Sequence, residues 1–321
     1  MSAPVSGQEC TALQVIAGHD LSGKEAIVTG GTSGLGYQTA LALATAGARV
    51  VVTGRDQARG DTAARALRAR TGNQAVAYRQ LDLTSIESVT GWARRHAAAG
   101  RPLHILVNNA GVMATPLTRT ADGFESQFGV NHLAHFALTN GLVPALRAAG
   151  RARVICLTSS AHRRSDIDYD DPNYRRQPYD RWQAYGQSKT ANALFAVAFT
   201  ARHRGQGATA NAVMPGAIRT GLQRHLTDAD LRERGWLDAG GGWAAAGWKT
   251  AEQGAATTVW AAVAPELDGV GGQYLEDCAA AVPWTGPGEL PRGHYLPYAM
   301  DPANAGRLWV LSGQLLDHLQ G

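Results

Sequence analysis

The chain has 321 residues, of which 45% are hydrophobic and 17% are charged, so it can fold around a substantial core and is not intrinsically disordered. Its formal net charge of +4 comes from scattered basic residues rather than a basic block, which argues against nucleic-acid binding. The three cysteines, Cys10, Cys156 and Cys278, are odd in number and lack metal-ligand spacing, which favours a reduced, cytoplasmic protein. No stretch resembles a signal sequence or approaches the ~18 apolar residues of a membrane span.

Strand-like and helix-like segments alternate along most of the chain. Short apolar runs rich in β-branched residues predict strands at 25–29, 48–53, 75–83, 104–108, 153–158 and 208–213. Helix-period segments lie between them, beginning with 38–46 and 56–70. Apolar strands separated by helices are typical of parallel sheets covered on both faces. The pattern predicts an α/β fold with a doubly wound parallel sheet, a three-layer α/β/α Rossmann-like single domain over residues 1–321.

Two segments interrupt the alternation, at 163–182 and 220–249, and both are long for connections in a compact domain. We expect substrate loops there, with plain surface insertions as the alternative. Trp236, Trp243 and Trp248 of the second segment either line a pocket for a bulky apolar substrate or dock the loop on the core. Residues 301–320 predict a final amphipathic helix.

A glycine-rich turn joins the first predicted strand to the first helix. Such glycines allow a tight turn and a close approach of the backbone, so that a pyrophosphate can bind at the helix N-terminus. We expect cofactor contacts from the residues of this turn: Thr29, Gly30, Thr32, Ser33, Gly34, Leu35 and Gly36.

The end of the second strand bears on which dinucleotide is bound. A carboxylate about ~20 residues after the glycine turn would bind a ribose 2′-hydroxyl, but Arg55 stands there instead. An arginine suits a 2′-phosphate, which favours NADP(H) as the cofactor. If Arg55 is only exposed, or pairs with Asp56, dual specificity remains open.

Tyr185 and Lys189 lie four residues apart, on one face of a predicted helix. A nearby ammonium group favours the phenolate and lowers the tyrosine pKa, which tunes the phenol for proton transfer. This spacing alone is common, and it gains weight from the nucleotide-binding turn upstream.

Together, these motifs resemble the short-chain dehydrogenase/reductase family over about residues 22–280. The ordered matches are Thr29-Gly30-x-x-x-Gly34-x-Gly36, Asn108-Asn109-Ala110-Gly111, Ser160 and Tyr185-x-x-x-Lys189. Finer details resemble the branch of retinol dehydrogenases, the WW-domain oxidoreductase and protochlorophyllide reductase: Ser159-Ser160-Ala161-His162, Tyr185-Gly186-Gln187-Ser188-Lys189 and Ala191-Asn192. The chain has no visible WW domain, and no cysteine near the Tyr-Lys segment, which disfavours protochlorophyllide reduction.

The resemblance implies a catalytic role for four residues. Tyr185 exchanges a proton with the carbonyl or alcohol oxygen, and Lys189 lowers the Tyr185 pKa and binds the nicotinamide ribose. Ser160 holds and polarises the substrate oxygen, with Ser159 as the competing serine. Asn131 helps to hold a water for the proton relay through Lys189. The resemblance also implies a homo-oligomer paired through the helices that carry Asn131 and Tyr185.

Further cofactor contacts follow from the same resemblance. Asp82 and Leu83 are expected near the adenine, and Asn108, Asn109, Ala110 and Gly111 beneath the cofactor. Pro215, Gly216, Ile218 and Thr220 are expected to orient the nicotinamide carboxamide, and Tyr185 and Lys189 also contact the cofactor.

Other residues have plainer interpretations. His132 and His135 lack a third ligand at metal spacing, so no metal site is expected. His162 is a candidate for substrate contact, and Met113 for packing.

The expected function is reduction of a ketone or aldehyde, or the reverse, with a secondary-metabolite ketone as one candidate substrate. The alternatives are epimerisation, dehydration or imine reduction on the same fold, or a non-catalytic NADPH-sensing protein.

Overall fold

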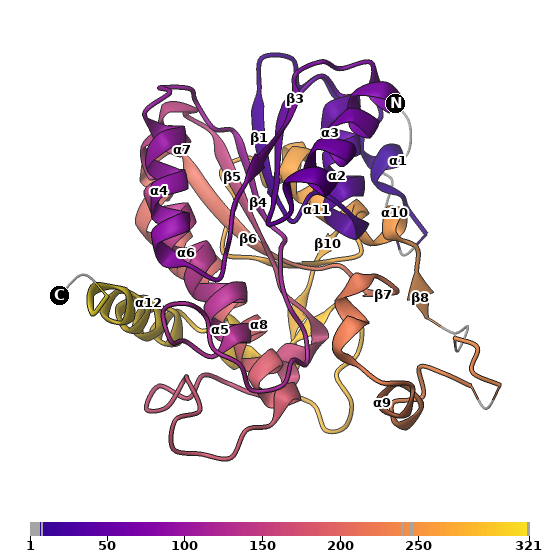
Figure 1. Ribbon diagram of the computed structural model, residues 1–321, viewed down its shortest axis with the longest axis vertical. Coiled ribbons are helices and arrows are strands. Elements are labelled where there is room, and N and C mark those ends of the chain that lie inside the picture. The colour runs from indigo at the N-terminus through magenta and orange to yellow at the C-terminus, as the bar shows by residue number, and fades with distance from the viewer. Residues whose placement is uncertain (1–6, 8, 239, 244–246, 320–321) are drawn as a thin grey trace.

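A central eight-stranded sheet organises the chain, as the computed structural model shows (Figure 1). The structure describes residues 7, 9–238, 240–243 and 247–319. The sheet order is β10-β9-β6-β5-β4-β1-β2-β3, and β10 alone runs antiparallel. Its strands are β1 Glu25–Thr29, β2 Arg49–Gly54, β3 Val76–Gln80, β4 Ile105–Asn108, β5 Ala152–Leu157, β6 Ala208–Met214, β9 Tyr274–Glu276 and β10 Ala279–Ala280.

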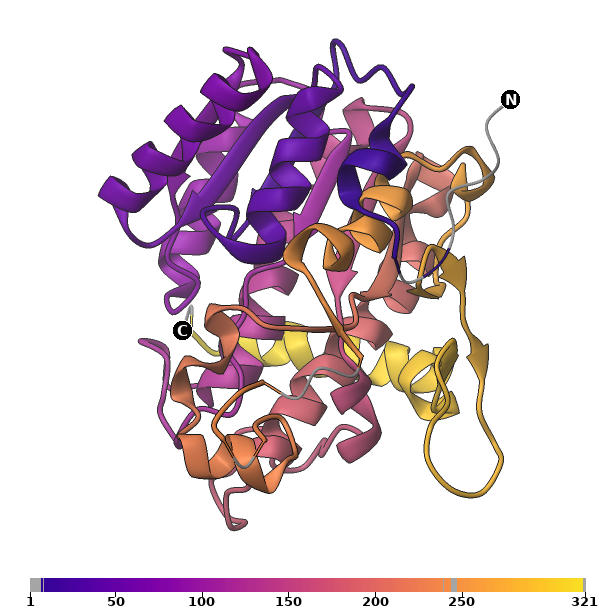
Figure 2. The ribbon, with the colours of Figure 1, turned by 90° about the vertical axis from the view of Figure 1, so that its right-hand side faces the viewer.

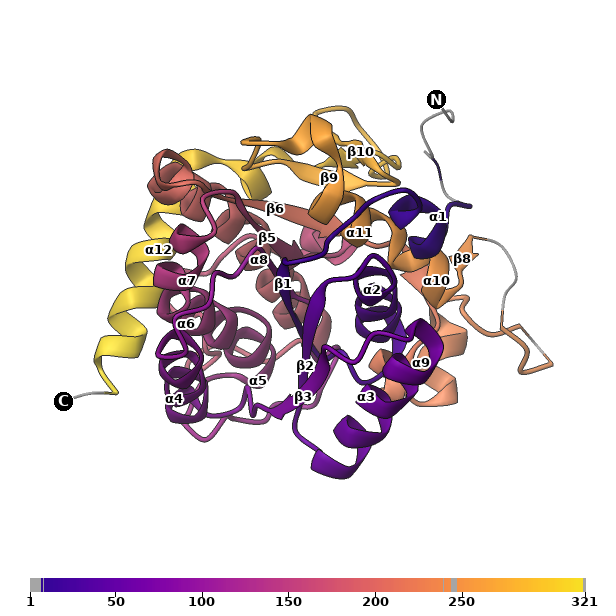
Figure 3. The same ribbon diagram turned by 90° about the horizontal axis from the view of Figure 1, so that it is seen from above.

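Helices cover both faces of this sheet (Figure 3). One layer comprises α4 Ile86–Ala97, α6 Ala134–Gly141, α7 Val143–Ala148 and α8 Arg181–His203, and the other comprises α1 Ala12–Ile16, α2 Gly34–Thr45, α3 Gln57–Thr71 and α11 Ala256–Val263. Side chains of one strand alternate between the two layers: Ile27 of β1 packs with the α4/α8 layer, and Val28 packs with the α1/α2 layer. The expected doubly wound, three-layer α/β/α fold is confirmed.

Shorter elements complete the chain. The remaining α-helices are α5 Ser126–Phe128, α9 Asp228–Glu233, α10 Ala251–Gly254 and α12 Pro302–Asp317, and two small sheets pair β7 Ala217–Ile218 with β8 Trp248–Lys249 and β11 Val282–Pro283 with β12 His294–Tyr295. A π-helical segment, η1, spans Gly129–Leu133, and 3-10 turns are η2 Ser160–Arg164, η3 Arg204–Gln206, η4 Gly221–His225, η5 Pro265–Leu267 and η6 Pro297–Met300.

Helix α12 packs across the outer surface of α6 and α8. Its Trp309 ring contacts Phe136 edge-on at 4.9 Å and stacks on Phe195 at 5.9 Å, and the Arg202 guanidinium lies 4.3 Å from its centroid. The expected terminal helix is therefore present, except that residue 320 of the expected range lies outside the described residues. α12 thus covers part of the outer surface of α6 and α8, and the pairing of two copies stays a prediction.

The segment 163–182 is only partly at the expected substrate mouth. Its middle folds back on Asp168 and Asp171, whose carboxylates accept backbone N–H hydrogen bonds within the loop. Asn173 also accepts a hydrogen bond from the Glu125 backbone at 2.9 Å, which ties the loop to the start of α5. Only its two ends, near Arg164 and Trp182, border the site described below.

The segment 220–249 lies over the same end of the molecule (Figure 2). Trp182, Trp236, Trp248 and Trp243 form a chain of edge-on ring contacts, with centroids 6.0, 5.3 and 4.9 Å apart in that order. An ion pair between Arg181 and Asp230 joins α8 to α9. The tryptophans thus dock the loop, and Trp236 also lines a cavity.

Candidate active site

The candidate site lies at the carboxyl ends of β1 and β4, where the strand order of the sheet reverses. Thr29 Oγ1 accepts hydrogen bonds from the backbone N–H groups of Asn109 (2.9 Å) and Ala110 (3.0 Å). Asn109 Nδ2 in turn donates to the Thr29 carbonyl at 2.7 Å. The Thr29 side chain is completely buried and holds the turn after β4 against the end of β1, and a cofactor contact of Thr29 stays a prediction.

The glycine turn after β1 leaves an open backbone surface. Gly30 and Gly34 have φ values of 65° and 54°, which favour glycine. A Cβ at Gly31 would lie 2.6 Å from Val52 Cγ1, and one at Gly36 would lie 2.5 Å from Asn109 Nδ2. The Ser33 side chain does not cap α2. The first N–H groups of this helix therefore face the turn without a capping side chain from the described residues.

The other expected cofactor residues border this turn or its continuation. A Cβ at Gly34 would lie 3.5 Å from Thr220 Cγ2, so Thr220 stands against the turn. Gly216 has a φ of 99° beside Lys249, and the side chain of Asp82 accepts hydrogen bonds from Thr84. Within the expected set, Thr32, Ser33, Leu35 and Pro215 are partly or largely exposed, Ile218, Leu83 and Asn108 are buried, and Asn108 Nδ2 donates to Thr139.

Helix α8 carries Tyr185 and Lys189 on its buried face. Asp180 caps the helix by accepting hydrogen bonds from the N–H groups of Trp182 (2.8 Å) and Gln183 (2.7 Å). Tyr185 and Lys189 are 4% and 5% exposed, so both lie almost wholly beneath the surface. Lys189 Nζ donates to the Leu157 carbonyl at the end of β5, at 3.0 Å, and lies 5.6 Å from the Tyr185 ring centroid.

Burial governs the protonation of this pair. It raises the pKa of Tyr185 to about 12, a rise that a hydrogen bond with Ser159 opposes. It lowers the pKa of Lys189 to about 8, because the ammonium is removed from water. Lys189 is not among the causes of the Tyr185 shift, so the Tyr185 pKa moves upward, opposite to the expected lowering, and Tyr185 is a protonated phenol at neutral pH.

Asn131 lies in the π-helical segment η1, a rare element that often occurs at functional sites. Its Oδ1 accepts the Val112 N–H at 2.8 Å, and its Nδ2 donates to the Val112 carbonyl and to Ser188 Oγ, both at 2.9 Å. A Cβ at Gly111 would lie 2.9 Å from Asn131 Oδ1 and 3.8 Å from Lys189 Nζ. Through these hydrogen bonds Asn131 joins the segment after β4 to Ser188 of α8, the residue next to Lys189.

Both candidate serines lie just after β5. Ser159 is the last extended residue, with φ −161° and ψ 155°, and a side-chain hydrogen bond with it opposes the rise of the Tyr185 pKa. Ser160 begins the 3-10 turn η2 and lines a cavity with Met214, Tyr274 and the expected cofactor residue Gly216. The sequence-based choice of Ser160 over Ser159 stays a prediction.

The histidines near the site have structural roles. His162 is completely buried; its Nε2 accepts the Leu296 N–H at 3.1 Å, so its Nδ1 donates to the Ser159 carbonyl at 2.9 Å. A substrate contact of His162 stays a prediction. His135 links Thr29 Oγ1 to the Asn131 carbonyl, each at 2.9 Å. Burial lowers the pKa of both histidines to about 4, so they are neutral. Across the described residues, no three His, Cys, Asp or Glu side chains gather as a metal site.

A second arginine accompanies Arg55, and the sequence did not indicate it. Arg55 is exposed and, among the described residues, makes no ion pair; the Asp56 carboxylate caps α3 instead. Burial, followed by the positive charges of Arg55 and Arg59, lowers the pKa of Arg224 in η4. Arg224 therefore lies near enough to Arg55 and Arg59, which are distant in the chain, for their charges to act on it.

The fold, the nucleotide turn and the buried Tyr-Lys pair define a dinucleotide-dependent oxidoreductase architecture. Residues 24–231 match the family described as short chain dehydrogenase, and the chain belongs to this family. It is 45% identical over 299 residues to a "Probable oxidoreductase" of Streptomyces lividans, covering 92% of this chain and 99% of that protein.

Two further comparisons agree with this assignment. Human "Retinol dehydrogenase 12" is 38% identical over 296 residues, covering 92% of this chain and 87% of the relative, which confirms the resemblance to retinol dehydrogenases. The Pseudomonas aeruginosa RhlG/NADP active-site complex superposes with a TM-score of 0.60 at 26% identity, covering 80% of this chain and 95% of that one. In the described part of the chain, no helix has both the length and the apolar character needed to cross a membrane.

Proposed function

We propose that the protein is an NADP(H)-dependent oxidoreductase that reduces a ketone or aldehyde to an alcohol, or catalyses the reverse reaction, by hydride transfer. The observation that carries this proposal is the buried pair Tyr185 and Lys189, which lies beside Ser159 at the switch point of the sheet.

The glycine turn fits a dinucleotide. A Cβ at Gly31 would collide with Val52 and one at Gly36 with Asn109, so this tight turn requires glycine, and the N-terminus of α2 offers N–H groups to pyrophosphate oxygens. The bound cofactor supplies or accepts the hydride. Gly111 and Lys189 lie at the far end of this surface, where the lysine is positioned to bind the nicotinamide ribose.

Arg55 and Arg224 support NADP(H) rather than NAD(H). A ribose 2′-phosphate carries negative charge, and guanidinium groups bind phosphate through paired, charge-assisted hydrogen bonds. The mutual repulsion of Arg55, Arg59 and Arg224 would be relieved by such an anion.

The protein's own groups then handle the proton. The Tyr185 phenol, protonated because burial raises its pKa to about 12, donates its proton to the substrate carbonyl oxygen. The Ser159 hydroxyl donates a hydrogen bond to the same oxygen and stabilises the developing charge. Lys189 is positioned to return a proton toward Tyr185, and Asn131 holds the turn beside the lysine. A protonated Tyr185 at rest is in the form that donates the proton required for reduction.

An apolar cluster surrounds Tyr185 and supports a substrate that is apolar next to its carbonyl group. Met113 and Ala114 pack against Tyr185, together with partly buried side chains of the loops: Ala161, Trp182, Leu222, Leu226 and Trp236. We further propose a single domain, and a cytoplasmic location for which the free thiols of Cys10, Cys156 and Cys278 are the support. A homo-oligomer, if formed, needs a surface other than the one under α12.

The decisive experiment replaces Tyr185 by Phe. NADPH oxidation with a panel of ketones and aldehydes should fall by at least about 10²-fold, because the general acid is lost, while NADPH binding persists. Tyr37→Phe, on α2, is the matched control and should retain activity. Mass analysis of the product should show a gain of two hydrogens, which separates reduction from epimerisation or dehydration. Full activity of Tyr185→Phe would refute the mechanism.

A further inference from the structure

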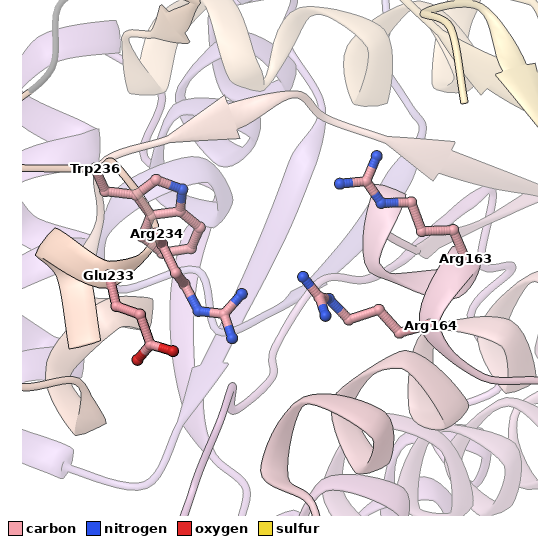
Figure 4. Close-up of a pocket in the computed structure, with 5 residues that line it drawn as sticks. All are labelled: Arg163, Arg164, Glu233, Arg234 and Trp236. Atoms are coloured by element: carbon pink, nitrogen blue, oxygen red, sulfur yellow. The ribbon is translucent and has the colours of Figure 1, made fainter. Parts of the chain in front are cut away.

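A cavity of about 370 Å³ opens beside the apolar cluster, between η2 and the end of α9. Its lining is unusually basic: Arg163 and Arg164 lie on one side, and Arg234 and Trp236 on the other, with Glu233 as the single acidic residue. Figure 4 shows the guanidinium groups of both sides directed toward the space between them.

The arginines of this cavity lack anionic partners in the protein. Among the described residues, neither Arg163, Arg164 nor Arg234 has a carboxylate oxygen within ion-pair distance, although Glu233 lines the same cavity. Burial, and then the charge of Arg164, lower the pKa of Arg234, and the charges of Glu233 and Asp180 offset this only in part. Three guanidinium groups that face one cavity with a single carboxylate in its lining favour the entry of an anion.

Aromatic packing holds two of these groups in place. The Arg234 guanidinium carbon lies 3.4 Å from the Trp182 ring centroid, and that of Arg164 lies 5.9 Å from the same centroid. The Arg181–Asp230 ion pair joins α8 to α9, the helix that precedes Arg234. The cavity is therefore built from two loops that tertiary contacts bring together.

The cavity shares one side chain, Trp236, with the apolar cluster around Tyr185 at the proposed reaction site. Arg163 and Arg164 belong to the turn η2 that Ser159 caps, and a Cβ at Gly186, next to Tyr185, would lie 3.0 Å from Arg164 Cβ. A substrate whose carbonyl meets Tyr185 can thus extend past Trp182 and Trp236 toward the arginines.

We propose that this cavity binds an anionic group, a carboxylate or a phosphate, carried by the carbonyl substrate beyond its apolar part. The inference rests on the proposed function and deepens it, because it names the substrate class as an apolar carbonyl compound with an acidic end. It also modifies the sequence-based expectation of a substrate that is simply bulky and apolar.

A substrate comparison tests the proposal through selectivity. Straight-chain ω-oxo carboxylates of increasing length, their methyl esters and the matching ω-oxo phosphates are compared by kcat/KM with NADPH. We expect the acid of optimal length to exceed its ester by about tenfold or more, mainly through KM, since charged hydrogen bonds contribute at that scale. Arg234→Gln and Arg164→Gln should reduce this ratio toward one, Arg234→Lys should restore part of it, and Arg232→Gln, on the exposed side of α9, should not alter it. The carboxylate and phosphate series show which anion is preferred.

A binding experiment separates this inference from the proposed function. Titration calorimetry with octanoate and with octanamide needs no turnover. We expect octanoate to bind at least about tenfold more tightly to the unmodified protein, and the difference to disappear in Arg164→Gln/Arg234→Gln, whose fold is checked by circular dichroism. Equal binding of the acid and the amide, with uncharged aldehydes still reduced, overturns the anion site and leaves the reductase intact. Anion binding without any carbonyl reduction leaves the site standing and refutes the proposed function.

Discussion

Replacement of Ser159 by Ala, compared with replacement of Ser160 by Ala, tests which of the two candidate serines stabilises the substrate oxygen. The two serines are adjacent, equal in size and both partly buried, so each variant is the natural control for the other. A hydrogen bond with Ser159 opposes the rise of the Tyr185 pKa, whereas Ser160 lines the cavity of Met214 and Tyr274. We therefore expect only the first variant to lose transition-state stabilisation.

The magnitude follows from the role of the hydroxyl. Loss of one preorganised donor to a developing oxyanion costs about 2.7–4 kcal/mol, or a factor of about 10²–10³ in kcat. The Ser159 hydroxyl also accepts the Ala161 N–H at 3.1 Å, so Ser159→Ala additionally weakens the start of η2. Loss of such a cap costs about 1 kcal/mol of folding free energy, which leaves the protein folded.

The assay is NADPH oxidation with a reducible aldehyde, with kcat and KM determined for both variants and NADPH affinity measured separately. Ser159→Ala should lower kcat by about 10²-fold or more, while Ser160→Ala should change it by less than about threefold. NADPH affinity should be similar in both. A large loss for Ser160→Ala with little change for Ser159→Ala would refute the role proposed for Ser159 and support Ser160, the sequence-based choice.

Three further predictions concern the cofactor, pH and the C-terminal helix. Arg55→Glu should raise KM for NADPH about tenfold while KM for NADH does not rise, because only NADPH presents a 2′-phosphate to the arginine. Arg65→Gln, on the following helix α3, is the control. Equal effects of Arg55→Glu on both cofactors would contradict the preference for NADP(H). Because burial lowers the pKa of Lys189 to about 8, reduction should fall toward tenfold per pH unit above that value as the ammonium is lost. In the window from about 8 to the ordinary value of 10.5, the unfolded chain binds the Lys189 proton more strongly, so the free energy of unfolding should rise with pH, and Lys189→Met should abolish both trends. Trp309→Ala should lower the free energy of unfolding, measured in urea, by about 2 kcal/mol, because the half-buried ring packs on Phe136 and Phe195. Val310 is 54% exposed, so Val310→Ala should change this free energy by less than about 0.5 kcal/mol. Equal effects of the two variants would show that α12 is not docked as described.

Local patterns were sufficient for much of the fold. Five-residue apolar runs such as 25–29 form strands wherever they are covered on both faces, and a glycine turn between a strand and a helix admits few conformations. The antiparallel strand β10 and the short β9 were not predicted, because two or three residues of strand carry no periodicity. The cover that α12 provides for α6 and α8 depends on contacts between residues more than a hundred positions apart, and no local pattern encodes it.

The sequence by itself determined the alternation of strands and helices, the nucleotide turn and the pairing of Tyr185 with Lys189, because each depends on spacings of a few residues. Only the tertiary structure decided that burial moves the pKa of Tyr185 upward. It alone also brought Arg224 to Arg55, and Arg234 to Arg164, across gaps of 169 and 70 positions in the chain. Desolvation and like-charge repulsion arise from the surroundings of a group, and those surroundings exist only once distant segments are packed together.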